Sequence, residues 1–244
     1  MLRKSAKIAM VGTLGLGIAA LGSTNSAFAA DDKDYESDAK IEFEQNTDPT
    51  NPVDPKDPDE ESDPDDKDDK DNEEAKKGPL SIDYASSLDF GEQEISSDDK
   101  VYDVKPIDIG DDEERAPFVQ VTDKRGSLAG WNVTVTQESQ LKTGDGDDDA
   151  ELKGAEITMS EGQVNGTQDT EGVSGNEEFT LTPEESSDVF DAEEDHGAGT
   201  FTNSFGDDDT PEKGAQLSVP AGTKIEEDDY SADLTWTLTD APAE

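Results

Sequence analysis

LTWTLT, residues 234–239, alternates apolar and polar side chains without a break. Leu234, Trp236 and Leu238 fall on one face of an extended chain and the three threonines on the other, because successive side chains of a strand point to opposite faces. Burying one indole removes about 150 to 250 Å² from water, so such a strand can supply much of a core. The stretch therefore predicts a β-strand with one buried face.

The second tryptophan of the chain follows the same rule, more than a hundred residues earlier. In WNVTVT, residues 131–136, Trp131, Val133 and Val135 share one face while Asn and Thr share the other. Two interpretations of the tryptophans remain open. They are core residues of a sandwich, or they form an exposed apolar patch that stacks on sugar rings or docks a partner.

From Pro79 onward the chain consists of short alternating runs separated by glycine, aspartate and asparagine. Period two dominates, and the runs are rich in the β-branched and aromatic residues that favour strands. This pattern predicts an all-β fold, an antiparallel β-sandwich that forms a single domain over residues 79–242. The runs are LSIDYA (80–85), VYDVKPIDIG (101–110), PFVQVTD (117–123), GWNVTVT (130–136), AEITMS (155–160), EEFTLT (177–182), AGTFTNSF (198–205), AQLSVP (215–220) and ADLTWTLTD (232–240).

Residues 1–29 have the pattern of a secretory signal peptide. Arg3, Lys4 and Lys7 precede an apolar run over residues 8–21, and small residues follow at the expected cleavage point. The run is shorter than the roughly 20 residues that a membrane-spanning helix needs. We therefore expect a secreted protein with no membrane span after cleavage.

The charge balance is strongly acidic. Cleavage removes three of 19 basic residues and changes the formal net charge from -45 to -48. Nucleic acid and anionic lipid are excluded as partners, because binding them requires cationic patches. The acidic residues indicate either adaptation to a salty habitat, where repulsion is screened, or binding of cations or a basic partner. The chain has no cysteine, so a packed core must stabilise it without disulfides.

The segment 30–78 is acidic and rich in proline. Residues 31–78 hold 21 acidic and 7 basic side chains, and only Val53 and Ala75 are apolar between residues 46 and 78. Such a composition predicts a disordered, extended spacer. Just before this part, Ile41 and Phe43 share a face in AKIEFEQ, which predicts a short strand at 39–45.

The C-terminal pattern Tyr230-x-x-x-Leu-Thr-Trp236-Thr-Leu238-x-x-x-Pro242 resembles the signature of the WxL domain, found on surface proteins of Gram-positive bacteria. GWNVTV is similar to that family's upstream motif, although Val133 stands where the motif has leucine. Valine is also aliphatic and lies on the same face of the strand, so it can be buried in the same way. The likeness covers essentially the whole chain. It extends to TDPTNPVDP (47–55), LSIDYASSLDFGEQEIS (80–96), PFVQVTDKRGSLAGWNVTV (117–135) and LSVPAGT (217–223).

The resemblance implies a non-covalent association with the cell wall, with a structural or adhesive role. The implied partner is peptidoglycan, bound directly or through membrane-anchored WxL-interacting proteins and other WxL proteins. The sequence shows no covalent sorting motif or lipobox cysteine, which agrees with this expectation. An alternative is a subunit that binds other WxL-locus proteins instead of glycan. The residues expected in binding, or in the core of the motifs, are Trp131, Val133, Tyr230, Leu234, Trp236 and Leu238.

Other chemistry has little support in the sequence. Asp145, Asp147, Asp149 and Glu156 have the spacing of an EF-hand calcium loop, but position 6 is not glycine and the flanks have strand patterns. These four residues are weak metal candidates, and we expect no cofactor apart from this calcium possibility. The single histidine, His196, lies in an acidic loop, so we expect no catalytic residues and no enzyme. A secreted carbohydrate-active enzyme remains the alternative of another class.

Overall fold

A computed structural model describes residues 35–65, 76–110, 113–144, 146, 149–207 and 209–243. The predicted signal peptide lies outside the described residues. Residues 35–42 carry no strand and belong to a unit separate from the chain that starts at Phe43. The described part of that second unit contains strands and one short 3-10 turn, η1 (Pro211–Lys213), and no α-helix. The strands are β1 (Leu80–Ala85), β2 (Lys100–Asp103), β3 (Ile107–Asp108), β4 (Glu114–Arg115), β5 (Phe118–Asp123), β6 (Trp131–Gln137), β7 (Glu156–Ser160), β8 (Gly162–Gly166), β9 (Val173–Gly175), β10 (Glu178–Leu181), β11 (Ser186–Ala192), β12 (Gly199–Phe205), β13 (Ala215–Val219) and β14 (Leu234–Thr239).

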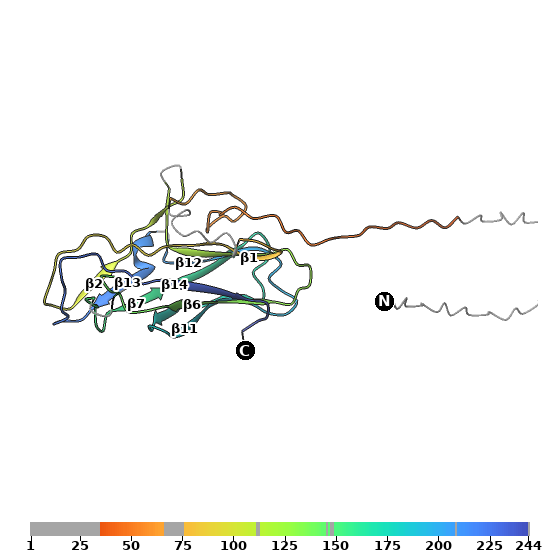
Figure 1. The fold of residues 1–244 in the computed structure, drawn as a ribbon. Coiled ribbons are helices and arrows are strands. Elements are labelled where there is room, and N and C mark those ends of the chain that lie inside the picture. The colour runs from red at the N-terminus through yellow and green to blue at the C-terminus, as the bar shows by residue number, and fades with distance from the viewer. Residues whose placement is uncertain are drawn as a thin grey trace, which may run out of the picture. The chain divides into compact units, whose positions relative to one another are not determined.

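All described strand pairs are antiparallel, which confirms the predicted all-β class. Three sheets have four strands each, in the orders β1-β5-β12-β8, β10-β7-β13-β2 and β14-β6-β11-β9, and β3 pairs with β4. Strands far apart in sequence lie side by side, such as β14 beside β6 (Figure 1). The fold therefore depends on long-range pairing.

One core joins the three large sheets. Ile82 and Val121 of the β1 sheet belong to the same buried cluster as Trp131 and Val133 of the β14 sheet. Ile157, from the sheet of β2, β7 and β13 at the left of Figure 1, belongs to this cluster as well. In strands such as β7 and β13, alternating residues supply the apolar face, as period two requires.

Four strands were not predicted from the sequence pattern: β4, β8, β9 and β11. The alternation in β11 is interrupted because the register shifts between Asp188 and Phe190, which leaves Val189 as an extra residue. Val189 and Phe190 are both buried despite being neighbours. A bulge of this kind breaks the strict alternation of buried and exposed residues by which a strand is predicted from sequence.

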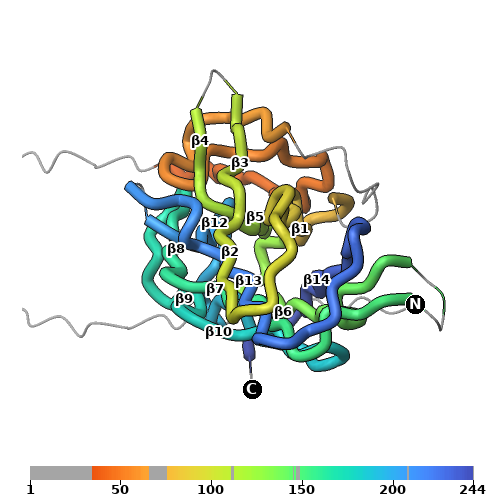
Figure 2. The backbone as a smooth tube through the Cα atoms, turned by 90° about the vertical axis from the view of Figure 1, so that its left-hand side faces the viewer, coloured from red at the N-terminus to blue at the C-terminus, as the bar shows by residue number. Residues whose placement is uncertain are grey.

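Part of the acidic segment is ordered, which corrects the expectation of a disordered spacer. Residues 46–65, here called the strap, run beside the β1 sheet (Figure 2). Val53 is buried and pairs with Glu61 in an isolated bridge. The Val53 amide donates to Gln120 Oε1 at 2.8 Å, and Gln120 Nε2 donates to the Asn51 carbonyl at 3.0 Å. Polar side chains of the sheet thus hold a strap in which Val53 is the one apolar residue apart from its prolines.

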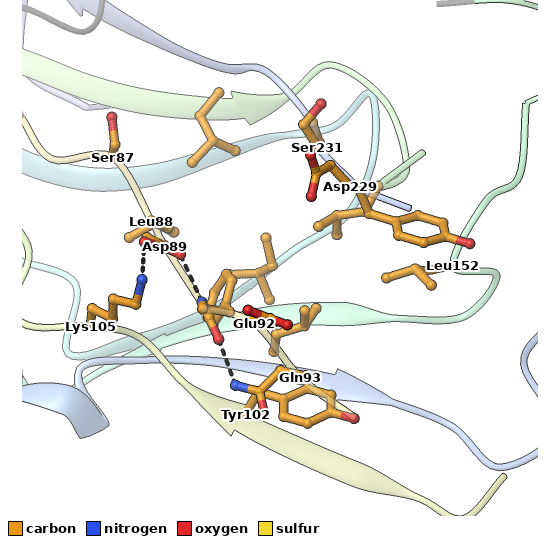
Figure 3. Close-up of a pocket in the computed structure, with 18 of the residues that line it drawn as sticks. Ser87, Leu88, Asp89, Glu92, Gln93, Tyr102, Lys105, Leu152, Asp229 and Ser231 are labelled. Carbon is orange, nitrogen blue, oxygen red and sulfur yellow. Dashed lines mark hydrogen bonds and ion pairs between the residues drawn. The ribbon is translucent and has the colours of Figure 1, made fainter. Parts of the chain in front are cut away.

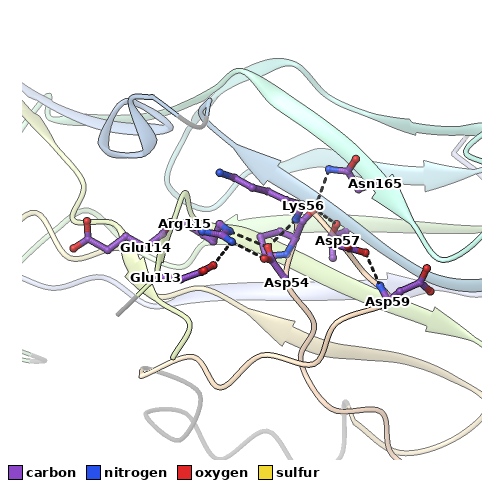
Figure 4. Close-up of polar contacts among 10 residues, drawn as sticks. Asp54, Lys56, Asp57, Asp59, Glu113, Glu114, Arg115 and Asn165 are labelled. Carbon is purple, nitrogen blue, oxygen red and sulfur yellow. Dashed lines mark hydrogen bonds and ion pairs between the residues drawn. The ribbon is translucent and has the colours of Figure 1, made fainter. Parts of the chain in front are cut away.

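The same kind of contact holds the second half of the strap. The Pro55 carbonyl accepts from Asn165 Nδ2 at 2.9 Å and from Thr202 Oγ1 at 3.1 Å. Two guanidinium nitrogens of Arg115 donate to the Asp54 carboxylate, Nε to Oδ1 at 2.9 Å and Nη2 to Oδ2 at 2.6 Å (Figure 4). Composition could not reveal these partners, because they lie at least 61 residues away in sequence.

The strand predicted at 39–45 is absent: these residues carry no regular secondary structure. Ile41 and Phe43 are 78% and 84% exposed. Two apolar side chains among acidic ones bury too little area to offset the entropy lost in ordering the chain.

Candidate functional site

The two tryptophans lie on the same face of one sheet, on neighbouring strands. In the β14–β6 ladder, Trp236 lies opposite Val135 and Leu238 lies opposite Val133. Residues opposite each other in an antiparallel pair have side chains on the same face. Because residues two apart in a strand also share a face, Trp131 and Trp236 belong to one apolar surface.

Trp131 is entirely buried. Its ring meets Phe190 edge to face at a centroid distance of 4.7 Å and lies 6.3 Å from Phe201. Its Nε1 donates to the Gly197 carbonyl at 3.0 Å, which satisfies the indole N–H in the interior. Val133 is buried as well. Both residues of the upstream motif therefore contribute to the core.

The loop that receives the Trp131 N–H requires glycine. Gly197 has φ +77°, and a Cβ at this position would lie 2.6 Å from Trp131 Nε1 and 2.3 Å from Ala192 Cβ. Only glycine combines this backbone with so close an approach. The neighbouring His196 is half-buried in the same loop, and its ring packs against Gly172, where a Cβ would lie 2.3 Å from the imidazole.

Trp236 differs from Trp131 because it is only partly buried. With Leu234 and Tyr230, it lines a groove of about 1120 Å³. Residues of β1, including Ile82, line the same groove. Within the described chain, β1 and β14 are the end strands of their sheets, so the groove lies where two sheet edges meet.

The floor of the groove is apolar. It combines side chains from the two edge strands, from the sheet of β7 and β13, and from the loop at residues 86–95, part of which Figure 3 shows. The loop is held by Asp89, which accepts from Lys105 Nζ at 2.5 Å and from the Gly91 amide at 2.7 Å. The apolar and aromatic lining residues are Ile82, Tyr84, Leu88, Phe90, Tyr102, Leu141, Leu152, Ile157, Leu217, Val219, Ile225, Tyr230, Leu234 and Trp236.

The sides of the groove carry negative charge. The acidic stretch 226–229 and the exposed Glu92 and Glu94 line it, whereas its basic residues are Lys76 and Lys105. Lys105 is paired with Asp89. The site is therefore an apolar groove with an acidic rim.

Comparison of the sequence with known families identifies the family of the chain. The model of the WxL domain, described as surface cell wall-binding, matches residues 30–242. The chain belongs to the WxL domain family. Its function is surface cell wall binding, and its place is the cell surface. The comparisons with curated proteins and with solved structures returned no match.

Arg125 fixes the end of the strand that carries Trp236 in this WxL domain. Its buried guanidinium donates to Asp123, to the Gly130 carbonyl at 2.7 Å and to Asp240 just beyond β14. A Cβ on Gly130 would lie 2.7 Å from Pro242 Cγ, so the C-terminal segment packs closely on the start of β6. Arg125 was not predicted from the sequence; the available signal was the basic pair Lys124 and Arg125 inside the stretch VTDKRG.

Asp83 is a second residue that the sequence analysis missed. It is fully buried in β1 and accepts from Ser81 Oγ at 2.7 Å, Gln120 Nε2 at 3.0 Å and Thr122 Oγ1 at 2.5 Å. Burial raises the pKa of this carboxyl, and the three hydrogen bonds oppose that effect. Because Gln120 also holds the strap, Asp83 belongs to the polar layer between the strap and the sheet.

The calcium candidates are not brought together in the described residues. Asp145 and Asp147 lie outside them, and Asp149 accepts a hydrogen bond from the Gly146 amide. Glu156 is an exposed residue of β7. Within the described ranges, the structure contains no group of three His, Asp or Glu side chains suited to a metal ion. In that same part of the chain, no helix of the WxL domain is long and apolar enough to cross a membrane.

Proposed function

We propose that this WxL protein is a secreted component of the cell wall that attaches non-covalently to peptidoglycan and has a structural or adhesive role. The groove at Trp236 is the attachment site. The observation that carries the proposal is the contrast between the tryptophans: Trp131 is enclosed by the core, whereas Trp236 lines an open groove.

The size and lining of the groove suit a polymer segment. Binding sites for small molecules have volumes of roughly 300 to 1,000 Å³. This groove, at about 1120 Å³, is large enough to take one segment of a longer chain. Partly buried aromatic residues such as Trp236, Tyr230 and Tyr102 offer rings that stack on the apolar faces of wall components.

The motif residues divide into two roles in this proposal. Tyr230, Leu234 and Trp236 contact the ligand. Trp131 and Val133 hold the sheet in place, and Leu238, which does not line the groove, supports β14. The Tyr230 hydroxyl accepts from the Glu226 amide at 2.8 Å, which fixes the loop at the groove.

A second candidate partner is a protein. A membrane-anchored WxL-interacting protein or another WxL protein could pair with the free edge of β14. Binding to wall material stripped of protein separates the two candidates, because no protein partner remains there.

The experiment is a pull-down of purified protein on protein-free peptidoglycan. Trp236→Ala should weaken binding by roughly tenfold or more, the effect of losing about 1.4 kcal/mol of contact. Leu238→Ala is the matched control, since it truncates a half-buried residue of the same strand face outside the groove. Equal binding by both variants and the parent would contradict the proposed site, and absence of binding by the parent would contradict peptidoglycan as the ligand.

The same material tests the proposed absence of catalysis. A binding protein should be recovered from the wall by a chaotrope without wall hydrolase, and it should release no soluble fragments. Soluble sugars or peptides that increase with incubation time would indicate an enzyme.

A further inference from the structure

We propose that the groove binds an extended, amine-bearing peptide, namely the stem peptide of peptidoglycan, and not its glycan strand. This inference rests on the proposed wall attachment and names the part of the wall that enters the site. Three features of the groove carry it: its two strand edges, its apolar floor and its acidic rim.

The strand edges supply the backbone groups. In the described sheets, β1 pairs only with β5, and β14 pairs only with β6. Each strand therefore has a row of N–H and C=O groups on its other edge that no described strand covers. Extended peptides bind such edges by adding as a further strand, since their backbone groups match the ladder. A sugar chain has no regular backbone amides to match it.

The apolar floor suits the side chains of such a peptide. Leu234 and Trp236 of β14 line the groove together with Ile82 of β1. A stem peptide largely alternates L and D residues, so in an extended conformation its short side chains lie on one side of the backbone and face this floor. Wall stem peptides contain short apolar residues such as alanine, which fit beside a large indole without displacing it.

The acidic rim of the groove favours a ligand with positive charge. Glu226, Glu227, Asp228 and Asp229 are exposed residues of one stretch that lines the groove. Glu92 and Glu94 are exposed lining residues as well, while Lys105 is paired with Asp89 at 2.5 Å. A cationic amine is attracted to this rim, whereas an anionic wall polymer is repelled. An uncross-linked stem peptide carries such an amine at neutral pH.

Three probes prepared from one batch of protein-free peptidoglycan test the proposal. They are the intact polymer, the polymer with its free amines acetylated, and glycan strands whose peptides have been removed by an amidase. We expect strong binding to the first, roughly tenfold weaker binding to the second and loss of binding to the third. Equal binding to glycan strands and to the intact polymer would overturn this inference and leave the proposed wall attachment standing.

A matched pair of charge variants tests the rim. Glu226→Gln, Glu227→Gln and Asp229→Asn together remove three charges from the groove. Glu193→Gln, Glu194→Gln and Asp195→Asn together remove three from an exposed loop that does not line it. Only the first triple variant should lose the preference for free over acetylated amines. An unchanged preference in that variant would contradict the role of the rim.

Amide hydrogen exchange tests the strand edges directly. Soluble muropeptides with free amines should slow the exchange of backbone amides in Leu80–Ala85 and Leu234–Thr239. Stacking of sugar on Trp236 alone would leave these amides unprotected. Binding without any protection in either strand would overturn the strand-addition mode.

Discussion

Trp131 and Trp236 share one face of the β14-β6-β11-β9 sheet, but the first is fully buried and the second is only partly buried. The difference follows from position: β6 is flanked on both sides by β14 and β11, whereas β14 ends the sheet. The same side-chain type therefore serves the core in one strand and the groove in the other.

The first prediction uses this contrast to separate folding from binding. Trp131→Ala should lower the free energy of unfolding by about 3 to 5 kcal/mol, because it opens a cavity between Phe190 and Phe201. Trp236→Ala removes a partly buried ring and should cost only about half as much. Urea denaturation followed by far-UV circular dichroism measures both. A larger loss for Trp236→Ala would place that indole in the core and would remove it from the proposed site.

The second prediction concerns the strap. Arg115→Ala should cost about 3 kcal/mol, because it leaves Asp54, whose side chain is 10% exposed, without its bidentate partner. It should also speed tryptic cleavage after Lys56, which lies in the strap. Lys105→Ala removes a cation from a pair that is about 60% exposed on both sides and should cost at most about 1 kcal/mol. Equal cleavage rates in both variants would mean that Arg115 does not hold the strap.

The stability that the Arg115–Asp54 pair contributes should also depend on pH. Burial is the largest single effect and favours the protonated carboxyl, but the hydrogen bonds from Arg115 and the Lys56 amide, together with the charges of Arg115 and Lys56, outweigh it. The pKa of Asp54 therefore lies below its ordinary value of 3.8. A lowered folded-state pKa stabilises the fold above pH 3.8 and loses this contribution as the pH falls. Arg115→Ala should therefore cost less at pH 3 than at pH 7. A cost that does not change with pH would contradict the charge-assisted pair.

The third prediction concerns Asp83, whose contribution to stability should depend on pH in the opposite direction to that of Asp54. Burial raises the pKa of this carboxyl above 3.8, so the folded state holds the proton more tightly than the unfolded chain. The contribution of Asp83 to stability is therefore complete below pH 3.8 and is lost as the pH rises through the higher folded-state pKa. The stability of Asp83→Asn relative to the parent should increase over this range. Denaturation curves at pH 3.5, 5 and 7 measure the difference in the free energy of unfolding between Asp83→Asn and the parent. Taking this difference cancels the effect of the other carboxylates, which both proteins share. A difference that stays constant or decreases with pH would show that the pKa of Asp83 is not raised.

The fourth prediction follows from the formal net charge, which is -45 for the whole chain and -48 after the expected cleavage of residues 1–29. The thermal midpoint should rise from low salt toward about 1 M salt, where the Debye length falls to about 3 Å and repulsion is screened. A flat response would mean that the acidic residues are too far apart to repel one another. Sodium chloride titration with thermal melts provides the measurement.

Calcium provides a separate arm of the same experiment. At constant high ionic strength, millimolar calcium should leave the midpoint unchanged if the stretch around Asp149 is a simple turn. A rise that is abolished by Asp145→Asn, Asp147→Asn and Glu156→Gln together would establish the EF-hand-like spacing as a cation site.

Local pattern in the sequence determined the class of fold and the family. Alternation in LTWTLT and WNVTVT is a property of neighbouring residues, so it indicated strands and their buried faces, and the motifs at Trp131 and Trp236 pointed to the WxL domain. The sequence could not distinguish a central strand from an end strand, because that depends on which distant strands pair.

Tertiary structure alone decided where each motif residue lies. Pairing of β14 with β6 left one indole inside and the other beside a groove. The tertiary fold also brought Gln120 and Arg115 to the strap, where they add long-range hydrogen bonds to those that the strap makes within itself. The bulge at Val189 is the reason that β11 was not predicted. Val189 and Phe190 are adjacent and both buried, which the surrounding strands make possible but which breaks the two-residue alternation expected of a single strand.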